Sequence, residues 1–312
     1  MKSALKLGTR GSQLALWQAE QVAEKLKEVR HELEIEIRII KTTGDKILDV
    51  ALSRIGDKGL FTKEIEGELL QGGIDIAVHS MKDLPSEIPE GLCIGAVLKR
   101  EDPCDVLISH HNYRFEDLPQ GAVIGTSSLR RIAQMKAHRP DLRFCEIRGN
   151  VETRIKKMQE LNLDAIILAY AGVKRLGFEE RITDQLAFNL VLPAAGQGSI
   201  AVEAREGDAE IQALLKLIND EDSELAIKTE RAFLKELQGG CQVPIACLAQ
   251  LQGDRIILEG LAASLDGNRV FKGCEEGGRD QAIQIGRDLA RQLLTEGADA
   301  VLEEIRRENE NG

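Results

Sequence analysis

Short strand-like and helix-like segments alternate along most of this chain, from Leu5 to about Ile218. Leu33–Ile39 alternates apolar and polar residues with the period of two that marks a strand, and a helix-like run precedes it. Ser12 suits the N-cap of that run, which extends to about Lys27, because a serine hydroxyl accepts a hydrogen bond from the first helical turn. Strands that alternate with helices predict parallel or mixed sheets with helices on their faces, and so an α/β fold.

The C-terminal part of the chain has a different pattern. Val243–Leu251, Arg255–Ala263 and Arg269–Cys274 predict three antiparallel strands, with a turn at Asp266–Asn268 between the last two. Arg279–Leu294 is helical in pattern and closes this region. Three strands and a covering helix predict a small α+β domain.

The composition excludes several classes of protein. The net charge of −11 and the aromatic content of 3% argue against general nucleic-acid binding. The N-terminus lacks the apolar core of a signal peptide, and no run approaches the roughly 18 apolar residues of a membrane span. The six cysteines include no C-x-x-C pair, and His79 and His138 lack partners at metal-ligand spacing, so we interpret both histidines as structural. We therefore expect a cytoplasmic protein with no nucleic-acid, membrane or metal partner.

Three loops that follow strand-like segments combine helix starts with arginines. They are Gly8–Ser12, Gly125–Arg131 and Glu146–Asn150, the last with Arg154 one turn into the next helix. Ligands of open α/β sheets bind beyond the carboxyl ends of strands, and a helix N-terminus favours an anion. The segment 127–160 carries nine basic and four acidic residues within an acidic chain, which favours a focused anion site. The alternatives are ordinary helix caps with surface arginines and a solvated basic helix face.

Two further residues have side chains suited to chemistry. Cys241 lies in the glycine-rich loop Gly239–Pro244, between a helix-like and a strand-like run, which suits either a covalent attachment point or a nucleophile. Asp83 follows a buried-looking strand and adjoins Lys82, so it suits a general acid or base, or a group that stabilises a cationic intermediate. A helix-capping role for Asp83 is the alternative.

Six stretches, in this order along the chain, carry a family resemblance. They are Gly8–Ser12 with Leu14–Ala15, Val78–Pro85, Gly125–Arg131, Arg148–Val151 with Arg154, Pro193–Gly198, and the loop of Cys241. Together they resemble the porphobilinogen deaminase (hydroxymethylbilane synthase) family over essentially the whole chain. The resemblance implies a transferase of porphyrin and haem biosynthesis that condenses four porphobilinogen molecules head to tail, with loss of ammonia, into the linear tetrapyrrole hydroxymethylbilane. The alternative is a non-catalytic, two-lobed carboxylate-binding protein, which needs neither a third domain nor the Cys241 loop.

The resemblance also implies how the chain divides into domains. Two lobes with mixed sheets, similar to those of periplasmic binding proteins, would comprise 1–99 with 199–218, and 104–193; the C-terminal domain with the cofactor cysteine would comprise 222–312. Two features of the sequence fit the points at which the chain would pass from one lobe to the other. Lys99–Pro103 is linker-like, and Pro193–Gly198 interrupts the alternation of strands and helices. We expect the protein to be a monomer.

By position, the resemblance implies that Cys241 carries a covalent dipyrromethane cofactor through a thioether and that Asp83 is the catalytic carboxylate. A nearby carboxylate stabilises positive charge on a pyrrole N–H and can move the proton. The implied cofactor-binding residues are Lys82, Ser80, Thr126, Ser127, Ser128, Arg130, Arg131 and Arg154. The implied substrate-binding residues are Arg10, Ser12, Arg148, Lys58 and Phe61, the last two in a segment that resembles a mobile lid. Lys6 and Arg54 depart from the pattern of some family members, and because lysine and arginine are not interchangeable, their roles stay open.

Overall fold

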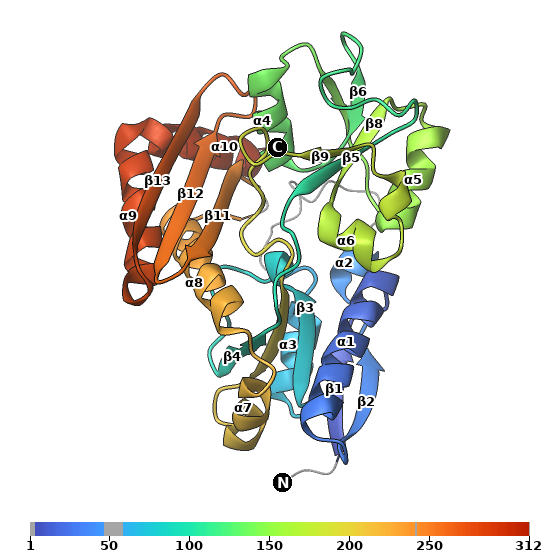
Figure 1. Ribbon diagram of the computed structural model, residues 1–312, viewed down its shortest axis with the longest axis vertical. Helices are drawn as coiled ribbons and strands as arrows, with labels where there is room; N and C mark the ends of the chain where they lie inside the picture. The colour runs from blue at the N-terminus through green and yellow to red at the C-terminus, as the bar shows by residue number, and fades with distance from the viewer. Residues whose placement is uncertain (1–3, 47–58, 241, 312) are drawn as a thin grey trace. The chain divides into compact units, whose positions relative to one another are not determined.

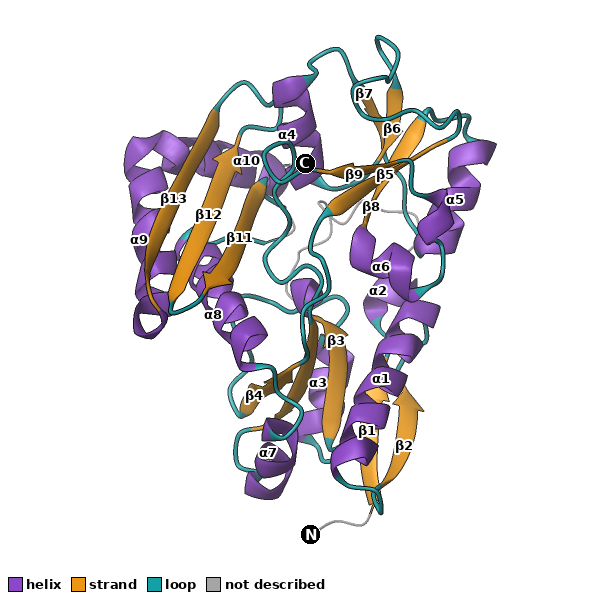
Figure 2. Ribbon diagram, viewed as in Figure 1, coloured by secondary structure: helices purple, strands orange, loops and turns teal. Residues whose placement is uncertain are grey.

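The computed structural model describes residues 4–46, 59–240 and 242–311, which form helices and strands (Figure 1, Figure 2). By internal packing the chain divides into two compact units. The described residues of the first unit fall within Met1–Leu48, Lys58–Glu101 and Gly198–Leu225. Those of the second unit fall within Asp102–Gln197 and Ala226–Gly312.

The first unit is built on a five-stranded mixed sheet in the order β2-β1-β3-β10-β4. Its strands are β1 (Ala4–Thr9), β2 (Glu34–Ile39), β3 (Ile76–Ser80), β4 (Leu92–Val97) and β10 (Ile200–Arg205). β1 runs parallel to β2 and β3, whereas β10 runs antiparallel to β3 and β4. The parallel strands β1 and β3 therefore end at the same edge of the sheet, which is where the loops of interest begin.

Helices cover both faces of this sheet because its strands carry apolar residues on both sides. The helices are α1 (Gln13–Val29), α3 (Lys63–Leu70) and α7 (Ala209–Lys216). Val78 of β3 lies in one core with residues of α1 and α7, whereas its neighbour Ala77 lies in another core with residues of α3. This alternation follows from the pleat, which directs successive side chains of a strand to opposite faces.

The second unit contains a second five-stranded mixed sheet, in the order β7-β6-β8-β5-β9. Its strands are β5 (Asp105–Ser109), β6 (Val123–Gly125), β7 (Arg143–Cys145), β8 (Ala165–Ala169) and β9 (Asp184–Leu186). Its main helices are α4 (Leu129–His138), α5 (Val151–Glu160) and α6 (Tyr170–Arg175). β6 is parallel to β7 and β8, and β5 is antiparallel to β8 and β9. The two sheets thus share one arrangement of strand directions.

A three-stranded antiparallel sheet completes the second unit. Its strands are β11 (Ile245–Gln252), β12 (Arg255–Ala263) and β13 (Val270–Gly278), and the helices α8 (Glu221–Glu236), α9 (Ala282–Leu293) and α10 (Asp299–Asn311) belong to the same C-terminal region. α9 packs closely on β13, since a Cβ added at Gly273 would lie 2.7 Å from the Leu289 side chain. The opposite face of the sheet packs on Ala133 of α4, with Ala246 and Ala263 in the same core.

The predicted fold class is confirmed by these three sheets, two of them mixed and one antiparallel. The predicted helix start at Ser12 is also confirmed, because its hydroxyl accepts a hydrogen bond from the Ala15 amide at 3.3 Å. The chain passes between its two compact units near Glu101, near Gly198 and near Leu225, the last of these within α8. The division into three domains stays a prediction.

Candidate functional site

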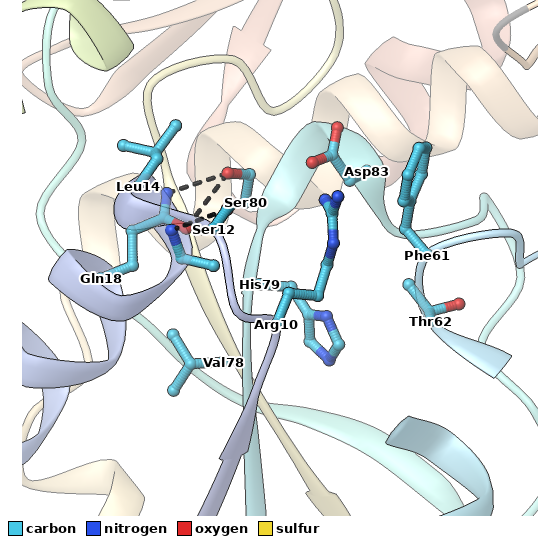
Figure 3. Close-up of a pocket in the computed structure, with 11 residues that line it drawn as sticks. Arg10, Ser12, Leu14, Gln18, Phe61, Thr62, Val78, His79, Ser80 and Asp83 are labelled. Atoms are coloured by element: carbon cyan, nitrogen blue, oxygen red, sulfur yellow. Dashed lines mark hydrogen bonds between the residues drawn. The ribbon is translucent and has the colours of Figure 1, made fainter. Parts of the chain in front are cut away.

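A pocket in the first unit lies where β1 and β3 end (Figure 3). Arg10 and Ser12 line it from the β1–α1 loop, and Ser80 and Asp83 from the segment that follows β3. The other lining residues are Leu14, Ala15, Gln18, Phe61, Thr62, Val78 and His79. The structure thus brings together five of the predicted site residues, which are Arg10, Ser12, Phe61, Ser80 and Asp83.

Arg10 and Phe61 form the most distinctive contact of this pocket. The guanidinium carbon of Arg10 lies 4.2 Å from the centre of the Phe61 ring, which is a cation–π contact. In Figure 3 the Arg10 guanidinium points toward the Asp83 carboxyl group. A cation, an aromatic face and a carboxylate therefore share one pocket, which suits a ligand that combines an anionic group with an unsaturated ring.

Asp83 lies in a short 3₁₀ turn, Met81–Asp83, directly after β3. The turn is anchored by Met81, which is buried and whose amide donates to the Ser199 carbonyl at 3.0 Å. The Asp83 side chain is exposed to solvent and lines the pocket. The N-cap of this turn is Ser80, and Asp83 is its last residue.

Two hydrogen-bonded pairs order the pocket wall. The buried Gln18 amide nitrogen donates to the Ser80 hydroxyl at 2.9 Å, and that hydroxyl lies 3.2 Å from the Gln18 amide oxygen. Thr9, which is also buried, donates its hydroxyl to the Ala15 carbonyl at 3.2 Å. These contacts fix the N-terminal turns of α1 against the end of β3, so the loops on both sides of the pocket have defined positions.

A cluster of buried titratable groups lies on the α3 side of the sheet. Nε2 of His79 lies 3.2 Å from a carboxylate oxygen of Glu203, and both side chains are almost fully buried. Burial raises the pKa of Glu66 on α3, and the Glu203 charge adds to this effect, whereas the Thr62 hydroxyl and His79 oppose it. His79, which the sequence led us to interpret as structural, also lines the pocket. The signal for Glu203 was a carboxylate inside the apolar strand 200–204.

Two of the predicted cofactor-binding arginines form a buried cluster in the second unit. The side chains of Arg130 and Arg131 lie in the first turn of α4, and both residues are 5–6% exposed. Asp105 accepts a hydrogen bond from Nη1 of Arg130 at one carboxylate oxygen and from Nη2 of Arg131 at the other, each at 2.7 Å. Burial raises the pKa of Asp105, but the two guanidiniums outweigh burial and hold it well below its usual range.

The hydroxyls of the β6–α4 loop are partly used to hold the loop itself. Thr126 accepts a hydrogen bond from the Ser128 amide at 3.2 Å. The Ser127 hydroxyl donates to the Ile147 carbonyl at 2.9 Å and accepts from the Ile147 amide at 3.2 Å. Ser127 therefore ties this loop to the segment after β7. Within the described residues, the Ser128 side chain makes no capping hydrogen bond to α4.

Arg148 and Arg154 flank the start of α5, beyond the carboxyl end of β7. Nε of Arg154 donates to the Gly149 carbonyl at 2.8 Å, and Asn150 caps the helix by accepting from the Thr153 amide at 2.8 Å. Gly149 has φ +123°, and an added Cβ would lie 2.7 Å from the Thr153 side chain, so glycine is required there. Because β6 and β7 are parallel neighbours, the loops that follow them lie at one edge of the sheet.

Two predicted site residues, Cys241 and Lys58, lie outside the described residues, as does Arg54. In the part of the chain that is described, no helix is long and apolar enough to cross a membrane. The same part contains no group of three or more His, Cys, Asp or Glu side chains placed to hold a metal ion.

Among solved structures, the chain shows a distant likeness to several proteins of low sequence identity. The methionine-binding protein MetQ is 9% identical, with a TM-score of 0.44 over 71% of this chain and 92% of that chain. The periplasmic VFT2 domain of BvgS from Bordetella pertussis is 14% identical, with a TM-score of 0.42 over 69% of this chain and 86% of that chain.

Comparison with protein families gives a much closer relationship. Residues 5–213 match the model described as porphobilinogen deaminase, dipyromethane cofactor binding domain, and residues 224–295 match the porphobilinogen deaminase C-terminal domain. A porphobilinogen deaminase of Syntrophomonas wolfei is 64% identical over 97% of this chain and 99% of its own length. A porphobilinogen deaminase of Carboxydothermus hydrogenoformans is 56% identical over 99% of this chain and 99% of its own length. Since both models match in order and these relatives align over nearly their full lengths, the chain belongs to the porphobilinogen deaminase family.

Proposed function

We propose that this protein condenses four porphobilinogen molecules head to tail, with loss of ammonia at each step, into the linear tetrapyrrole hydroxymethylbilane. The observation that carries the proposal is the pocket in which the exposed Asp83 carboxylate and the Arg10 guanidinium lie together. Membership in the porphobilinogen deaminase family, through models that match most of the chain, gives the substrate class.

Arg10 and Ser12 are suited to bind a carboxylate of the substrate. Porphobilinogen carries an acetate and a propionate side chain, and a guanidinium can bind both oxygens of one carboxylate. Ser12 caps α1, a helix of 17 residues, whose N-terminal dipole adds to the attraction for an anion. The Phe61 ring, in contact with Arg10, provides an apolar surface beside the bound pyrrole. The assignment of Arg148 and Lys58 to the substrate stays a prediction.

Asp83 is the proposed catalytic carboxylate. Loss of ammonia from the aminomethyl group and attack by a pyrrole carbon place positive charge on pyrrole N–H groups. A fixed carboxylate stabilises that charge and can accept and return a proton at the ring nitrogen. The hydrogen bond from the Met81 amide to the Ser199 carbonyl anchors the backbone of the turn from which the Asp83 carboxylate extends.

The residues of the second unit fit a cofactor that carries several carboxylates. Nε of Arg131 is a buried N–H donor that meets no acceptor within the described residues, and it belongs to a cluster with net positive charge. When bound through Cys241, a dipyrromethane supplies the pyrrole carbon on which the product is extended. The chain's own proposed carboxylate ligands are Arg130, Arg131, Arg154, Thr126, Ser127 and Ser128. The same role for Lys82 and Ser80, in the first unit, stays a prediction.

We further propose that the protein works in the cytoplasm as a monomer, without a metal or a nucleic-acid partner. None of the five described cysteines forms a disulfide, which is usual in a reducing compartment. Acid–base and electrostatic groups account for the proposed chemistry, so the reaction calls for no metal.

The proposal is tested by incubating the purified protein with porphobilinogen and measuring ammonia, remaining substrate and products. We expect one ammonia for each porphobilinogen consumed, and a linear tetrapyrrole as the main product. Binding of porphobilinogen without release of ammonia would instead support a non-catalytic carboxylate-binding protein. Isothermal titration calorimetry at a temperature and time where no product forms separates binding from turnover.

A further inference from the structure

Asp105 is a buried carboxylate that touches three functional groups of the second unit. It is the first residue of β5 and is fully buried. Oδ2 of Asp105 accepts a hydrogen bond from Nη1 of Arg130 at 2.7 Å. Oδ1 accepts one from Nη2 of Arg131 at 2.7 Å and another from Nε2 of Gln197 at 2.9 Å. The carboxylate thus joins the first turn of α4 to the segment that precedes β10.

The two guanidiniums are fixed from their other sides by backbone carbonyls. Nη1 of Arg130 also donates to the Leu192 carbonyl at 2.5 Å, and Nη1 of Arg131 donates to the Ile167 carbonyl at 2.9 Å. Each guanidinium therefore donates hydrogen bonds to at least two acceptors from different parts of the chain. A guanidinium held in this way cannot turn without breaking charge-assisted hydrogen bonds, which are stronger than neutral ones.

The charges of this cluster do not cancel. One carboxylate faces two guanidiniums, so the three side chains carry one net positive charge in a buried position. A buried charge without compensation is unfavourable, and so is a buried N–H without an acceptor, such as Nε of Arg131. An anionic oxygen bound at the arginines would relieve both features.

We propose that Asp105 is the positioning residue for the anion-binding arginines, Arg130 and Arg131. Its carboxylate orients both guanidiniums and cancels only one of their two positive charges. Covalent loading of the cofactor therefore depends on Asp105. This inference rests on the proposed function, in which Arg130 and Arg131 hold carboxylates of the dipyrromethane. Asp105 itself does not contact the cofactor and acts only through the two arginines. Gln197 takes part as a third donor to the same carboxylate, which links the segment before β10 to the orientation of the arginines.

The test compares Asp105→Asn with wild-type protein and with Asp141→Asn as a matched control. Asp141 forms a two-bond ion pair with Arg139 in the same sheet region, but that pair is partly exposed and belongs to no proposed site. Each protein is purified from cells that make porphobilinogen and is measured by native mass spectrometry. The charge states of folded molecules are separated from those of unfolded ones, and the fraction that carries the cofactor mass is read within the folded population.

We expect folded wild-type and Asp141→Asn molecules to carry the added mass, and folded Asp105→Asn molecules to carry it about tenfold less often, as the loss of a charge-assisted hydrogen bond predicts. A purely structural role for Asp105 would lower the folded population but leave its loading unchanged. Equal loading of folded Asp105→Asn and wild type would therefore overturn this inference and leave the proposed function intact. Wild-type protein that lacks the added mass would overturn both.

Asp105→Glu keeps the test decisive if Asp105→Asn does not fold. This variant keeps the negative charge but lengthens the side chain, so it displaces the carboxylate relative to Arg130 and Arg131. For this measurement the proteins are purified without cofactor, from cells that do not make porphobilinogen. We expect folded Asp105→Glu to load slowly and to require a higher concentration of added porphobilinogen for half-maximal loading. Loading at the wild-type rate and concentration would show that the position of the carboxylate does not matter, and would overturn the inference.

Discussion

The guanidinium carbon of Arg10 lies 4.2 Å from the centre of the Phe61 ring, so an aromatic face packs on a cation in the pocket that Asp83 also lines. The two residues come from different parts of the first unit, Arg10 from the loop after β1 and Phe61 from the segment before α3. This contact orients the cation without cancelling its charge, because a ring attracts a guanidinium through its quadrupole. Arg10 therefore stays suited to bind a substrate carboxylate.

Phe61→Leu is expected to weaken substrate binding. A cation–π contact at an exposed site contributes about 0.5–1 kcal/mol, so KM for porphobilinogen should rise about two- to fivefold while kcat changes little. Steady-state kinetics with the purified protein measure both constants. Phe271→Leu, which changes a half-buried ring of β13, is the control and should leave KM unaltered. An unchanged KM in Phe61→Leu would contradict a role for this ring in holding Arg10.

Asp83→Asn is expected to fold normally and to lose about 10²–10⁴-fold in kcat, the range typical for removal of a general acid–base group. The amide keeps the size of the side chain but neither carries the charge nor accepts a proton. The rate of ammonia release measures turnover, and intact mass shows whether the cofactor is retained. Glu90→Gln removes a charge from another exposed carboxyl group of the same unit and should turn over normally. A near-normal kcat in Asp83→Asn would remove Asp83 from the mechanism.

Cys241→Ser is expected to abolish the covalent adduct. The wild-type protein should exceed its sequence mass by two linked pyrrole units, and this excess should vanish in the variant because a serine hydroxyl forms no thioether. Cys274→Ser, at an exposed cysteine of β13, is the matched control and should keep the full excess. An adduct that persists in Cys241→Ser, or disappears in Cys274→Ser, would show that the attachment site is elsewhere.

Glu66→Gln is expected to change how stability depends on pH. Burial raises the pKa of Glu66 in the folded protein above its ordinary value of 4.5, so the folded state holds the proton more tightly than the unfolded state. The free energy of unfolding of the wild type should therefore fall as the pH rises from 4.5 through the folded pKa. The glutamine of the variant does not titrate. Above this pH window the free energy of unfolding of the variant should therefore exceed that of the wild type by about 1 kcal/mol, and below the window the two should be equal.

Urea unfolding at a series of pH values measures this difference. Glu68→Gln, on the exposed side of the same helix, is the control and should show the wild-type dependence on pH. If the difference in stability between Glu66→Gln and the wild type does not change with pH, the folded and unfolded states bind the Glu66 proton equally. A difference that grows toward acid would give the opposite sign for the shift.

Several features of this protein are determined by the sequence itself, because near neighbours in the chain carry them. The period of two in Leu33–Ile39 predicted a strand that the structure contains as β2, and Ser12 caps α1 as its position predicted. The three antiparallel strands after Val243 were predicted from strand-like runs and from the turn at Asp266–Asn268, although the third strand extends to Gly278 and not only to Cys274. Asp83 and Arg10 were found because loops that follow parallel strands gather at one edge of a sheet.

Only the tertiary structure decided how the buried charges are paired. Asp105 and the arginines of α4 are 25 or 26 residues apart, and they meet because β5 lies between β8 and β9 in the sheet. His79 and Glu203 meet because β10 returns from a distant part of the chain to pair with β3. No local pattern encodes such contacts, since strand order depends on the summed packing of distant elements. The sequence thus determines which loops and residues are available, and the packing of the sheets decides which charges are buried together and which face the ligand.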